Sequence, residues 1–286
     1  MNAAAAPLNA MTVDVEDYFH VSALAEVIDR KDWDRMEYRA EKSTERLLTL
    51  FADKGIKATF FVLGWVTKKS PNLVRKIHAA GHEVACHGLT HELVYRQTPE
   101  VFRDETKTSK AMLEDTIGAP VLGYRAASYS ITRQSLWAID ILCDLGFRYD
   151  SSIFPIAHDR YGIPGADTRP GILKDSRGNG IVEFPLSTVK FMGRRLPCSG
   201  GGYFRLLPYT YTRWALRKIN RDDQLPFIFY LHPWEIDPGQ PRFKASRLSR
   251  FRHYTNLSVC EKRLEQLIED FRFTTVREVL RPQLDA

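Results

Sequence analysis

Cysteine is scarce and scattered in this sequence. Its 286 residues include four cysteines, none of them in a C-x-x-C pair: Cys86, Cys143, Cys198 and Cys260. A zinc ribbon needs such pairs and a disulfide scaffold needs a higher density of cysteine, so both frameworks are excluded. An apolar core must hold the fold instead, and a chain of this length can bury a sizeable one.

Targeting and membrane-spanning segments are also missing. The first ten residues have no basic stretch ahead of an apolar one, so they do not read as a secretory signal, and no apolar run is long enough to span a bilayer. We therefore expect a soluble protein in the cytoplasm. The alternative is peripheral contact with the inner membrane, through a partner that exports or tethers the protein.

The basic residues form no recognised nucleic-acid motif. The formal net charge is +6, and the basic residues are scattered except over residues 213–221 and 242–252. Nucleic acid is therefore not an expected partner. A solvated face is the simplest interpretation of the two basic concentrations, with an anionic polymer or lipid headgroups as the alternative. The glycine-rich turn 197–202 lacks the lysine and strand-to-helix context of a phosphate loop.

Strands and helices alternate along the chain. Apolar runs predict strands, amphipathic stretches with capping residues predict helices between them, and glycine and proline predict a long loop. The expected strands are 11–16, 58–63, 83–87, 121–125, 147–150, 181–185, 227–231 and 274–279; the main helices begin near 43, 71, 99, 132, 209 and 261; the loop is 155–180. This pattern indicates an α/β protein with a largely parallel sheet.

Five polar residues follow or end different predicted strands: Asp14, His87, Arg125, Asp150 and His232. The carboxyl ends of parallel strands meet on one rim, where α/β folds build active sites. A barrel is therefore favoured, although an open doubly wound sheet would also gather these ends. No linker or repeat divides the chain, so we expect one domain over 1–286, with a catalytic core of about 11–235 and an extension of helix and strand over 236–286.

Two stretches have the composition of a metal site. His87 and His91 are four residues apart after an apolar run, and Asp14, Glu16 and Asp17 crowd the end of another. Two imidazoles at that spacing can face the same way, and crowded carboxylates are costly without a cation or a shared proton. Two nitrogens and one oxygen would leave coordination positions open, as in a catalytic rather than a structural site.

In their order, these stretches resemble the polysaccharide deacetylase family, the carbohydrate esterases that share a NodB-type domain. The resemblance covers most of 11–235 and rests on five segments: 14–17 (DVED), 87–91 (HGLTH), 125–129 (RAASY), 149–152 (YDSS) and 231–232 (LH). Segments 13–19, 149–155 and 200–205 look most like the branch associated with bacterial exopolysaccharide loci and the exosortase system. The resemblance implies a distorted (β/α) barrel with parallel strands and outer helices.

The resemblance also implies roles for individual residues. His87, His91 and one carboxylate would hold a divalent metal, most suitably Zn²⁺, with Co²⁺ or Ni²⁺ as substitutes. Asp14 would act as general base, fixed by a bidentate ion pair with Arg125, and His232 would protonate the leaving amine. Asp150 would orient His232 or bind sugar hydroxyls, or would simply cap a turn.

Two departures from the family pattern leave questions open. The usual pair of adjacent aspartates is replaced by Asp14, Glu16 and Asp17. Strand geometry puts Asp14 and Glu16 on one face, which favours Glu16 as the metal carboxylate and keeps Asp17 as the alternative. The arginine segment reads Arg-Ala-Ala-Ser-Tyr instead of Arg-Pro-Pro-Tyr, which affects the expected shape of the groove. Tyr129 and Trp234 are the expected substrate-binding aromatics, and Tyr129 or its backbone N–H is also expected at the oxyanion.

The expected function is a metal-dependent hydrolase that removes N-acetyl groups from hexosamine units of a bacterial exopolysaccharide or its lipid-linked precursor. An allantoinase-like amidohydrolase acting on a small cyclic amide or ureide is the first alternative. A non-catalytic glycan-binding component of a polysaccharide assembly complex is the second. That reading would fit a chain lacking one of the reactive positions, and Asp14, His87, His91 and His232 are all present. Peripheral contact with polysaccharide assembly proteins stays open, like contact with the inner membrane.

Overall fold

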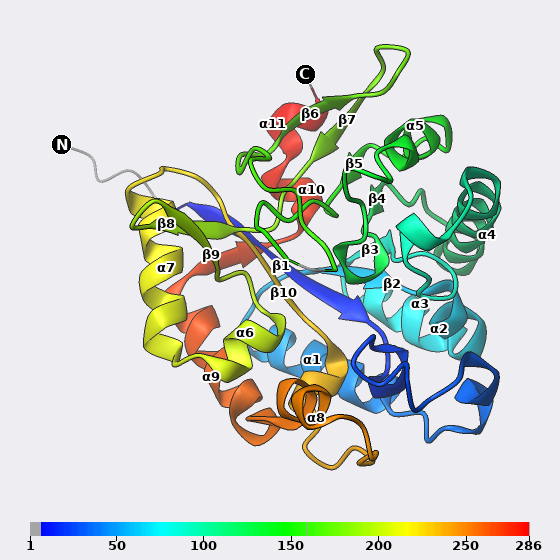
Figure 1. Ribbon diagram of the computed structural model, residues 1–286, viewed down its shortest axis with the longest axis vertical. Helices are drawn as coiled ribbons and strands as arrows, with labels where there is room; N and C mark the ends of the chain where they lie inside the picture. Colours follow the sequence, from blue (N-terminus) through cyan, green and yellow to red (C-terminus); the bar gives the residue numbers. More distant parts are fainter. Residues whose placement is uncertain (1–6, 159, 286) are drawn as a thin grey trace.

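A nine-stranded, mostly parallel sheet forms the centre of the protein in the computed structural model, which describes residues 7–158 and 160–285 (Figure 1). The strand order is β10-β1-β2-β3-β4-β5-β7-β6, and β11 also pairs with β1. The strands are β1 (Leu8–Val15), β2 (Thr59–Val62), β3 (Glu83–Cys86), β4 (Gly123–Tyr124), β5 (Tyr149–Asp150), β6 (Gly171–Lys174), β7 (Gly180–Glu183), β10 (Ile228–Leu231) and β11 (Arg272–Thr274). A separate antiparallel hairpin joins β8 (Thr188–Phe191) to β9 (Arg194–Pro197).

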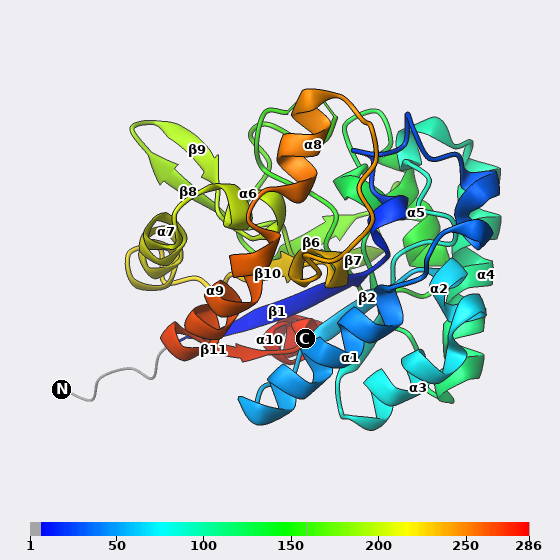
Figure 2. The same ribbon diagram turned by 90° about the horizontal axis from the view of Figure 1, so that it is seen from below.

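Helices surround this sheet (Figures 1 and 2). They are α1 (Ala40–Asp53), α2 (Gly64–Lys69), α3 (Pro71–Ala79), α4 (Pro99–Ile117), α5 (Trp137–Asp144), α6 (Gly201–Leu206), α7 (Tyr209–Arg221), α8 (Arg247–Tyr254), α9 (Leu257–Asp270), α10 (Val276–Val279) and α11 (Arg281–Leu284). Helix α4 has the predicted bounds because Thr98 caps its first turn, Pro99 occupies the first position and Gly118 takes the left-handed conformation after its last. Among the described helices, none is both long and apolar enough to cross a bilayer.

The central strands are buried on both faces. All residues of β1 after Leu8 are buried, as are all four residues of β2 and of β10. Parallel strands covered by helices on both faces carry such continuous apolar runs. Apolar side chains of β1, β2 and β10 pack with those of α1, α3 and α9 in the largest core cluster.

The predicted α/β class, with mostly parallel strands and outer helices, is confirmed. Within residues 7–158 and 160–285, no strand pairing joins β10 to β6, so the hydrogen-bonded ladder remains open between these two strands. The sheet therefore curves through eight neighbouring strands without closing as a regular barrel would.

Three local predictions were wrong. The expected loop 155–180 contains β6, which pairs antiparallel with β7. The expected strand 274–279 is mainly α10, because Thr275 caps a helical turn by accepting a hydrogen bond from the Glu278 N–H. The helix expected to begin near 132 begins at Trp137, since the Ser135 hydroxyl bonds the backbone of Ser130 and Thr132 and holds this segment in a turn.

The glycine-rich turn has a packing role. Gly200 adopts φ +127°, and a Cβ built on it would lie 1.9 Å from the Tyr230 carbonyl oxygen. Only glycine allows the backbone at 199–200 to approach β10 closely enough for the Tyr230 N–H to reach the Ser199 carbonyl at 2.8 Å. This contact places α6 beside the strand that leads to His232.

The ends of the parallel strands gather the predicted polar residues. Asp14 is the penultimate residue of β1, His87 follows β3, Arg125 follows β4, Asp150 ends β5 and His232 follows β10. Because β1 is hydrogen-bonded to both β10 and β2, residues from the two ends of the chain meet at its carboxyl end.

Candidate metal centre

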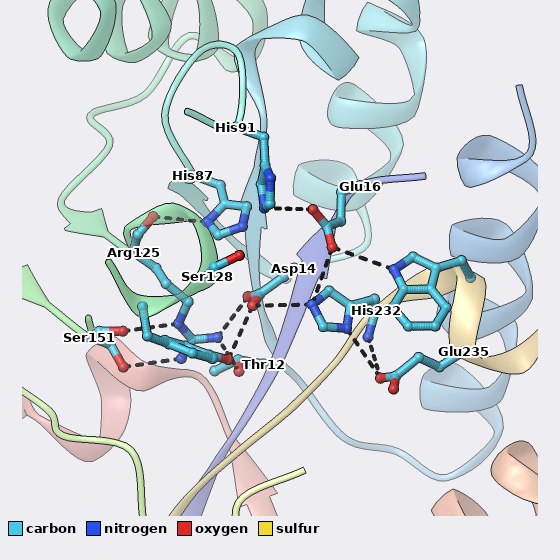
Figure 3. A network of polar contacts seen from close by, with 12 residues as sticks. Thr12, Asp14, Glu16, His87, His91, Arg125, Ser128, Ser151, His232 and Glu235 are labelled. Carbon is cyan, nitrogen blue, oxygen red and sulfur yellow. Dashed lines mark hydrogen bonds and ion pairs between the residues drawn. The ribbon is translucent and has the colours of Figure 1, made fainter. Parts of the chain in front are cut away.

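Three buried side chains form a candidate metal centre. Glu16, His87 and His91 each offer one ligand atom, and these atoms all lie within 4.8 Å of one another. Glu16 comes directly after β1, and the two histidines come from the segment after β3 (Figure 3). Two imidazole nitrogens and a carboxylate oxygen suit a divalent transition metal with open positions for water and substrate.

Arg125 sets the tautomer of His87. The Nδ1 of His87 lies 2.8 Å from the Arg125 carbonyl oxygen, which can only accept, so Nδ1 carries the proton and Nε2 keeps its lone pair. Burial lowers the pKa of His87 to about 4, against the opposing influence of Asp14. The imidazole is therefore neutral, which is the state a metal ligand requires.

Glu16 provides the test of whether these residues fit a metal. Its Oε2 lies 2.8 Å from His91 Nε2. The same oxygen is fully buried, and in spite of this short contact it has no hydrogen-bond partner among the described residues. Burial by itself raises the pKa of Glu16, but His91 and His232 outweigh burial and hold the pKa well below its usual range. A buried carboxylate oxygen that faces imidazole nitrogens without accepting a hydrogen bond fits a cation.

Asp17, the alternative metal carboxylate, lies outside this group of three. Its Oδ2 accepts the backbone N–H groups of Arg39 and Ala40 at 2.6 and 2.7 Å, and its Oδ1 accepts that of Tyr18 at 2.8 Å. The strand ends at Val15, and the next turn directs this carboxylate toward the start of α1. Asp17 is placed as a capping residue, and Glu16 is the carboxylate that faces the histidines.

Asp14 is held by Arg125, though not in the predicted bidentate manner. A single guanidinium nitrogen, Nη1, contacts Asp14 Oδ1 at 2.7 Å and also donates to the Thr12 hydroxyl at 2.8 Å. The remaining nitrogens bond to the carbonyl and hydroxyl of Ser151 at 3.1 Å each. Arg125 is fully buried, so these bonds fix the guanidinium and, through it, the Asp14 carboxylate.

His232 lies between three carboxylates. Its Nε2 is 3.3 Å from Glu16 Oε1 and 3.9 Å from Asp14 Oδ2, and its Nδ1 is 3.2 Å from Glu235 Oε2 (Figure 3). Burial lowers the pKa of His232, but Glu16 and Glu235 outweigh burial and raise it to about 9. The imidazole is thus protonated in the absence of another cation.

Glu235 and Arg205 are functional candidates that sequence reasoning missed. Glu235 also accepts the His232 backbone N–H at 3.1 Å, and its other oxygen accepts from Arg205 Nε at 2.8 Å. Arg205 is buried and donates to the carbonyl groups of Arg252, His253 and Thr255. The available signal was His-Pro-x-Glu at 232–235, in which proline opens a helical turn and glutamate at the third position bonds back to the capping residue.

The two expected substrate-binding aromatics are buried. Trp234 is 7% exposed, stacks on His232 with ring centroids 5.1 Å apart, and places its Nε1 3.4 Å from Glu16 Oε1. Tyr129 is 6% exposed, and its hydroxyl lies 3.4 Å from Asp14 Oδ2. Its backbone N–H is already bonded to the Ala126 carbonyl, which removes the expected donor to an oxyanion. Both rings support the polar network instead of offering a face to a sugar.

Asp150 does not orient His232. It is fully buried, and the Ser152 hydroxyl donates to its Oδ1 at 2.6 Å. Its register partner on β7 is Glu183, and each of the two carboxyl groups has one buried oxygen without a hydrogen-bond partner in the described part of the chain. Burial raises the pKa of both groups, and their mutual repulsion adds to this for Glu183. The pair therefore retains a proton that separated carboxyl groups would release.

This pair predicts a dependence of stability on pH. The folded state holds its proton to a higher pH than the unfolded chain, so its stabilising effect is complete at acidic pH and is lost as the pH rises through the raised pKa. The free energy of unfolding of Glu183→Gln, taken relative to that of wild type, should therefore increase by on the order of 1 kcal/mol as the pH is raised from about 5 to about 8. Urea unfolding at the two pH values measures this difference. The exposed Glu26→Gln is the control, and a Glu183→Gln protein with wild-type pH dependence would contradict the shared proton.

A cavity of about 1260 Å³ adjoins the centre. It reaches His91 and Ser128, and its walls come from the segment after β1, from α6, from α8, and from His158, Arg160 and Tyr161. Tyr203 is half-buried and lines this cavity with Tyr161 and Trp33. Aromatic and polar side chains around an open cavity of this size suit an extended polar ligand.

Family comparisons match two regions of the chain. Residues 32–149 match the model described as polysaccharide deacetylase, and residues 151–281 match a domain of unknown function, DUF3473. A Bradyrhizobium chitooligosaccharide deacetylase is 31% identical over 99 residues, which cover 35% of this chain and 43% of the relative. A Helicobacter pylori peptidoglycan deacetylase is 30% identical over 122 residues, covering 43% and 41%. The chain therefore spans less than half of the length of these relatives.

Other similarities extend over more of the chain. A chitooligosaccharide deacetylase from Sinorhizobium fredii is 29% identical over 189 residues, or 59% of this chain and 85% of the relative. A Mycobacterium smegmatis crystal structure, provisionally described as a polysaccharide deacetylase, gives a TM-score of 0.63 at 20% identity, covering 98% of this chain and 93% of that one. Puue allantoinase gives 0.62 at 16%, covering 96% and 89%. At these identities the two structures support the fold alone.

Proposed function

We propose, on the premise that residues 32–149 belong to the polysaccharide deacetylase family, that the protein is a metal-dependent hydrolase that removes acetyl groups from N-acetylated hexosamine units of a glycan. The observation that carries this proposal is the buried Glu16 oxygen beside His87 and His91, which has no hydrogen-bond partner within residues 7–158 and 160–285. These three residues would hold the metal. Zinc suits the donor set best, and cobalt or nickel would substitute for it.

Asp14 is proposed as the general base. A divalent metal at Glu16, His87 and His91 would supply Lewis acidity toward the acetyl carbonyl. Asp14 would accept the proton of the attacking water, and the contact with Arg125 at 2.7 Å holds its carboxylate in place beside the centre. The Tyr129 hydroxyl, 3.4 Å from the other oxygen of Asp14, further limits its rotation.

His232 is proposed as the general acid. Its Nε2 faces Asp14 and Glu16, whereas its Nδ1 is turned toward Glu235, so Nε2 is the nitrogen that would donate a proton to the leaving amine. Glu235 stabilises the protonated ring and fixes its orientation, and Arg205 prevents Glu235 from taking up the proton. Burial raises the pKa of Glu235, but Arg205 and His232 lower it to about 2.

The proposed substrate is a bacterial exopolysaccharide or its lipid-linked precursor. Three observations support this class: the resemblance of 13–19, 149–155 and 200–205 to the exopolysaccharide-associated branch, the size of the cavity, and relatives named for chitooligosaccharide and peptidoglycan. A small cyclic amide would occupy only a fraction of a cavity of about 1260 Å³.

The test combines metal analysis with acetate release. We expect purified wild type to contain about one equivalent of divalent metal, as a three-ligand catalytic site would hold, and to release acetate from N-acetylglucosamine oligomers. His87→Ala/His91→Ala should lose both properties. The exposed His78→Ala, on α3, is the matched control and should retain them.

Two outcomes would contradict the proposal. Undiminished acetate release by His87→Ala/His91→Ala would remove the metal from the reaction. Hydrolysis of small cyclic amides by a wild type inert toward the oligomers would favour the allantoinase-like alternative.

A further inference from the structure

We propose that the β8–β9 hairpin, residues 188–197, docks the protein onto a membrane surface that contains anionic lipids. The hairpin lies outside the main sheet, and its strand β8 packs against α7 (Figure 1). Its free end exposes large apolar side chains among basic ones. Three features of this end conflict with the ordinary rules for a solvent-exposed hairpin, and contact with an anionic bilayer resolves all three.

The first conflict is the residue at the turn. Met192 and Gly193 form a two-residue turn with φ +47° and +78°. Turns of this kind favour Asn-Gly, because an unbranched apolar side chain gains nothing from the left-handed conformation. Met192 is nevertheless 86% exposed, more than any other large apolar side chain in the described part of the chain. A strained backbone thus presents a hydrophobic group directly to the surroundings.

The second conflict is an apolar patch behind the turn. Phe191 is 48% exposed and Trp214 of α7 is 40% exposed, and their rings meet edge to face with centroids 5.5 Å apart. Together with Met192 they place three large apolar groups at one end of the molecule. Aromatic and thioether side chains at this density mark a surface that is covered by a partner or by lipid.

The third conflict is a pair of like charges. Lys190 and Arg195 occupy directly opposed positions in the antiparallel register, where two cations repel each other. Arg194 follows the turn, and the segment 188–197 contains no acidic residue. Within the described ranges 7–158 and 160–285, no carboxylate forms an ion pair with Lys190, Arg194 or Arg195. An anionic surface would neutralise the repulsion, which favours lipid headgroups over an apolar protein surface as the occupant.

The two basic segments of the sequence, 213–221 and 242–252, differ in whether their cations have ion-pair partners. Arg217 and Lys218 on α7 are paired with Asp270 and Asp222. Arg247 and Arg250 on α8 have no ion-pair partner among the residues described, and Leu248 and Phe251 beside them are each 57% exposed. Figure 2 shows α8 and the hairpin projecting on the same side of the molecule. Helix α8 is therefore placed to make a second contact with the same surface.

This orientation bears on the substrate. Leu248, Phe251 and Arg252 line the cavity that leads to His91, so a membrane contacted by α8 would lie at the mouth of that cavity. The consequence rests on the proposed function: a glycan attached to lipid, or held at the membrane, would reach the metal centre without leaving the surface. Membrane binding itself requires no catalysis and is tested separately.

The test measures co-sedimentation of the full chain with vesicles of phosphatidylglycerol and phosphatidylcholine in equal parts, and with vesicles of phosphatidylcholine alone. Wild type should bind the anionic vesicles at low salt and lose this binding at high salt. Phe191→Thr/Met192→Asn should weaken binding about tenfold or more, since two inserted apolar groups are removed. Lys190→Gln/Arg195→Gln should weaken it comparably.

Both variants separate binding from folding. Asparagine suits the left-handed turn better than methionine, and removal of one like-charge pair relieves repulsion, so thermal stability should stay the same or rise while vesicle binding falls. The matched control is Ile172→Thr on β6, which removes a 63%-exposed apolar group and should bind as wild type does. Glu16→Gln should also bind as wild type does, which distinguishes failure of docking from failure of the proposed chemistry.

Three outcomes would overturn the proposal. Failure of wild type to bind anionic vesicles at low salt would exclude membrane docking. Equal binding by wild type and the hairpin variants would exclude the hairpin as the contact. A dimer in sedimentation velocity that Phe191→Thr/Met192→Asn dissociates, without vesicle binding, would make a second copy of the chain the occupant.

Discussion

Replacing Asp14 by asparagine should reduce acetate release by about a thousandfold, in the range that a positioned general base contributes, while the bound metal is retained. Asparagine keeps an oxygen that can accept from Arg125 Nη1, now at 2.7 Å from Asp14 Oδ1, but it cannot take a proton from water. Acetate release and elemental analysis on the same preparation measure the two effects.

The matched variant for this prediction is Glu16→Gln, two residues further along the chain. Loss of the Glu16 carboxylate should release the metal together with the activity, because it removes the one oxygen ligand of the group of three. Asp14→Asn removes the carboxylate that contacts Arg125 and could destabilise the fold. Thermal unfolding of both variants therefore serves as the folding control. Loss of metal from Asp14→Asn, or near-normal activity in it, would contradict the separation of roles proposed for the two carboxylates.

Replacing Arg205 by methionine should destabilise the protein by on the order of 3 to 5 kcal/mol, the cost of breaking a buried ion pair from one side. Arg205 and Glu235 are each 1% exposed, and the guanidinium also satisfies three backbone carbonyl groups. Its removal leaves the Glu235 charge facing only His232. Urea unfolding measures the loss, and the temperature midpoint should fall with it.

Two further variants distinguish charge from packing. Arg263 donates to the carbonyl groups of Phe204, Arg205 and Leu207 but pairs with no carboxylate of the residues that the structure describes. Arg263→Met should therefore cost on the order of 1 kcal/mol. Arg205→Met/Glu235→Leu should recover part of the stability that the single variant loses, because no buried charge remains unpaired. A double variant less stable than the single one would show that hydrogen bonds to the carbonyl groups dominate.

The fold class was predictable because its signals are local. Helix α4 was predicted from Pro99 at its start and Gly118 after its end, and these signals act regardless of the rest of the chain. The burial of β1 and β10 was readable from continuous apolar runs. The missed β6 and the misassigned 274–279 depend instead on a partner strand and on one capping hydroxyl, and neither leaves a periodic pattern in the sequence.

The candidate site was predictable only as far as strand ends reveal it. The ends of β1, β3, β4 and β10 indicated which residues would meet, and the alternation along β1 favoured Glu16 over Asp17. The sequence could not show that Asp17 would cap α1, because that depends on Arg39 and Ala40 being folded against it. The burial of Trp234 likewise depends on His253, which stacks on its other side with centroids 4.4 Å apart.

The position of β1 in the sheet also determines when the centre can fold during synthesis of the chain. Met11 of β1 lies in register with Phe229 of β10. The first strand of the sheet therefore cannot complete its pairing until one of the last strands has been synthesised. Until that partner leaves the ribosome, β1 offers an unsatisfied apolar edge, the kind of segment that chaperones bind and that aggregates when it is left exposed. Pairing across so long a stretch of chain is slow. Folding of the centre that carries Asp14 and His232 therefore comes late in the synthesis of the chain.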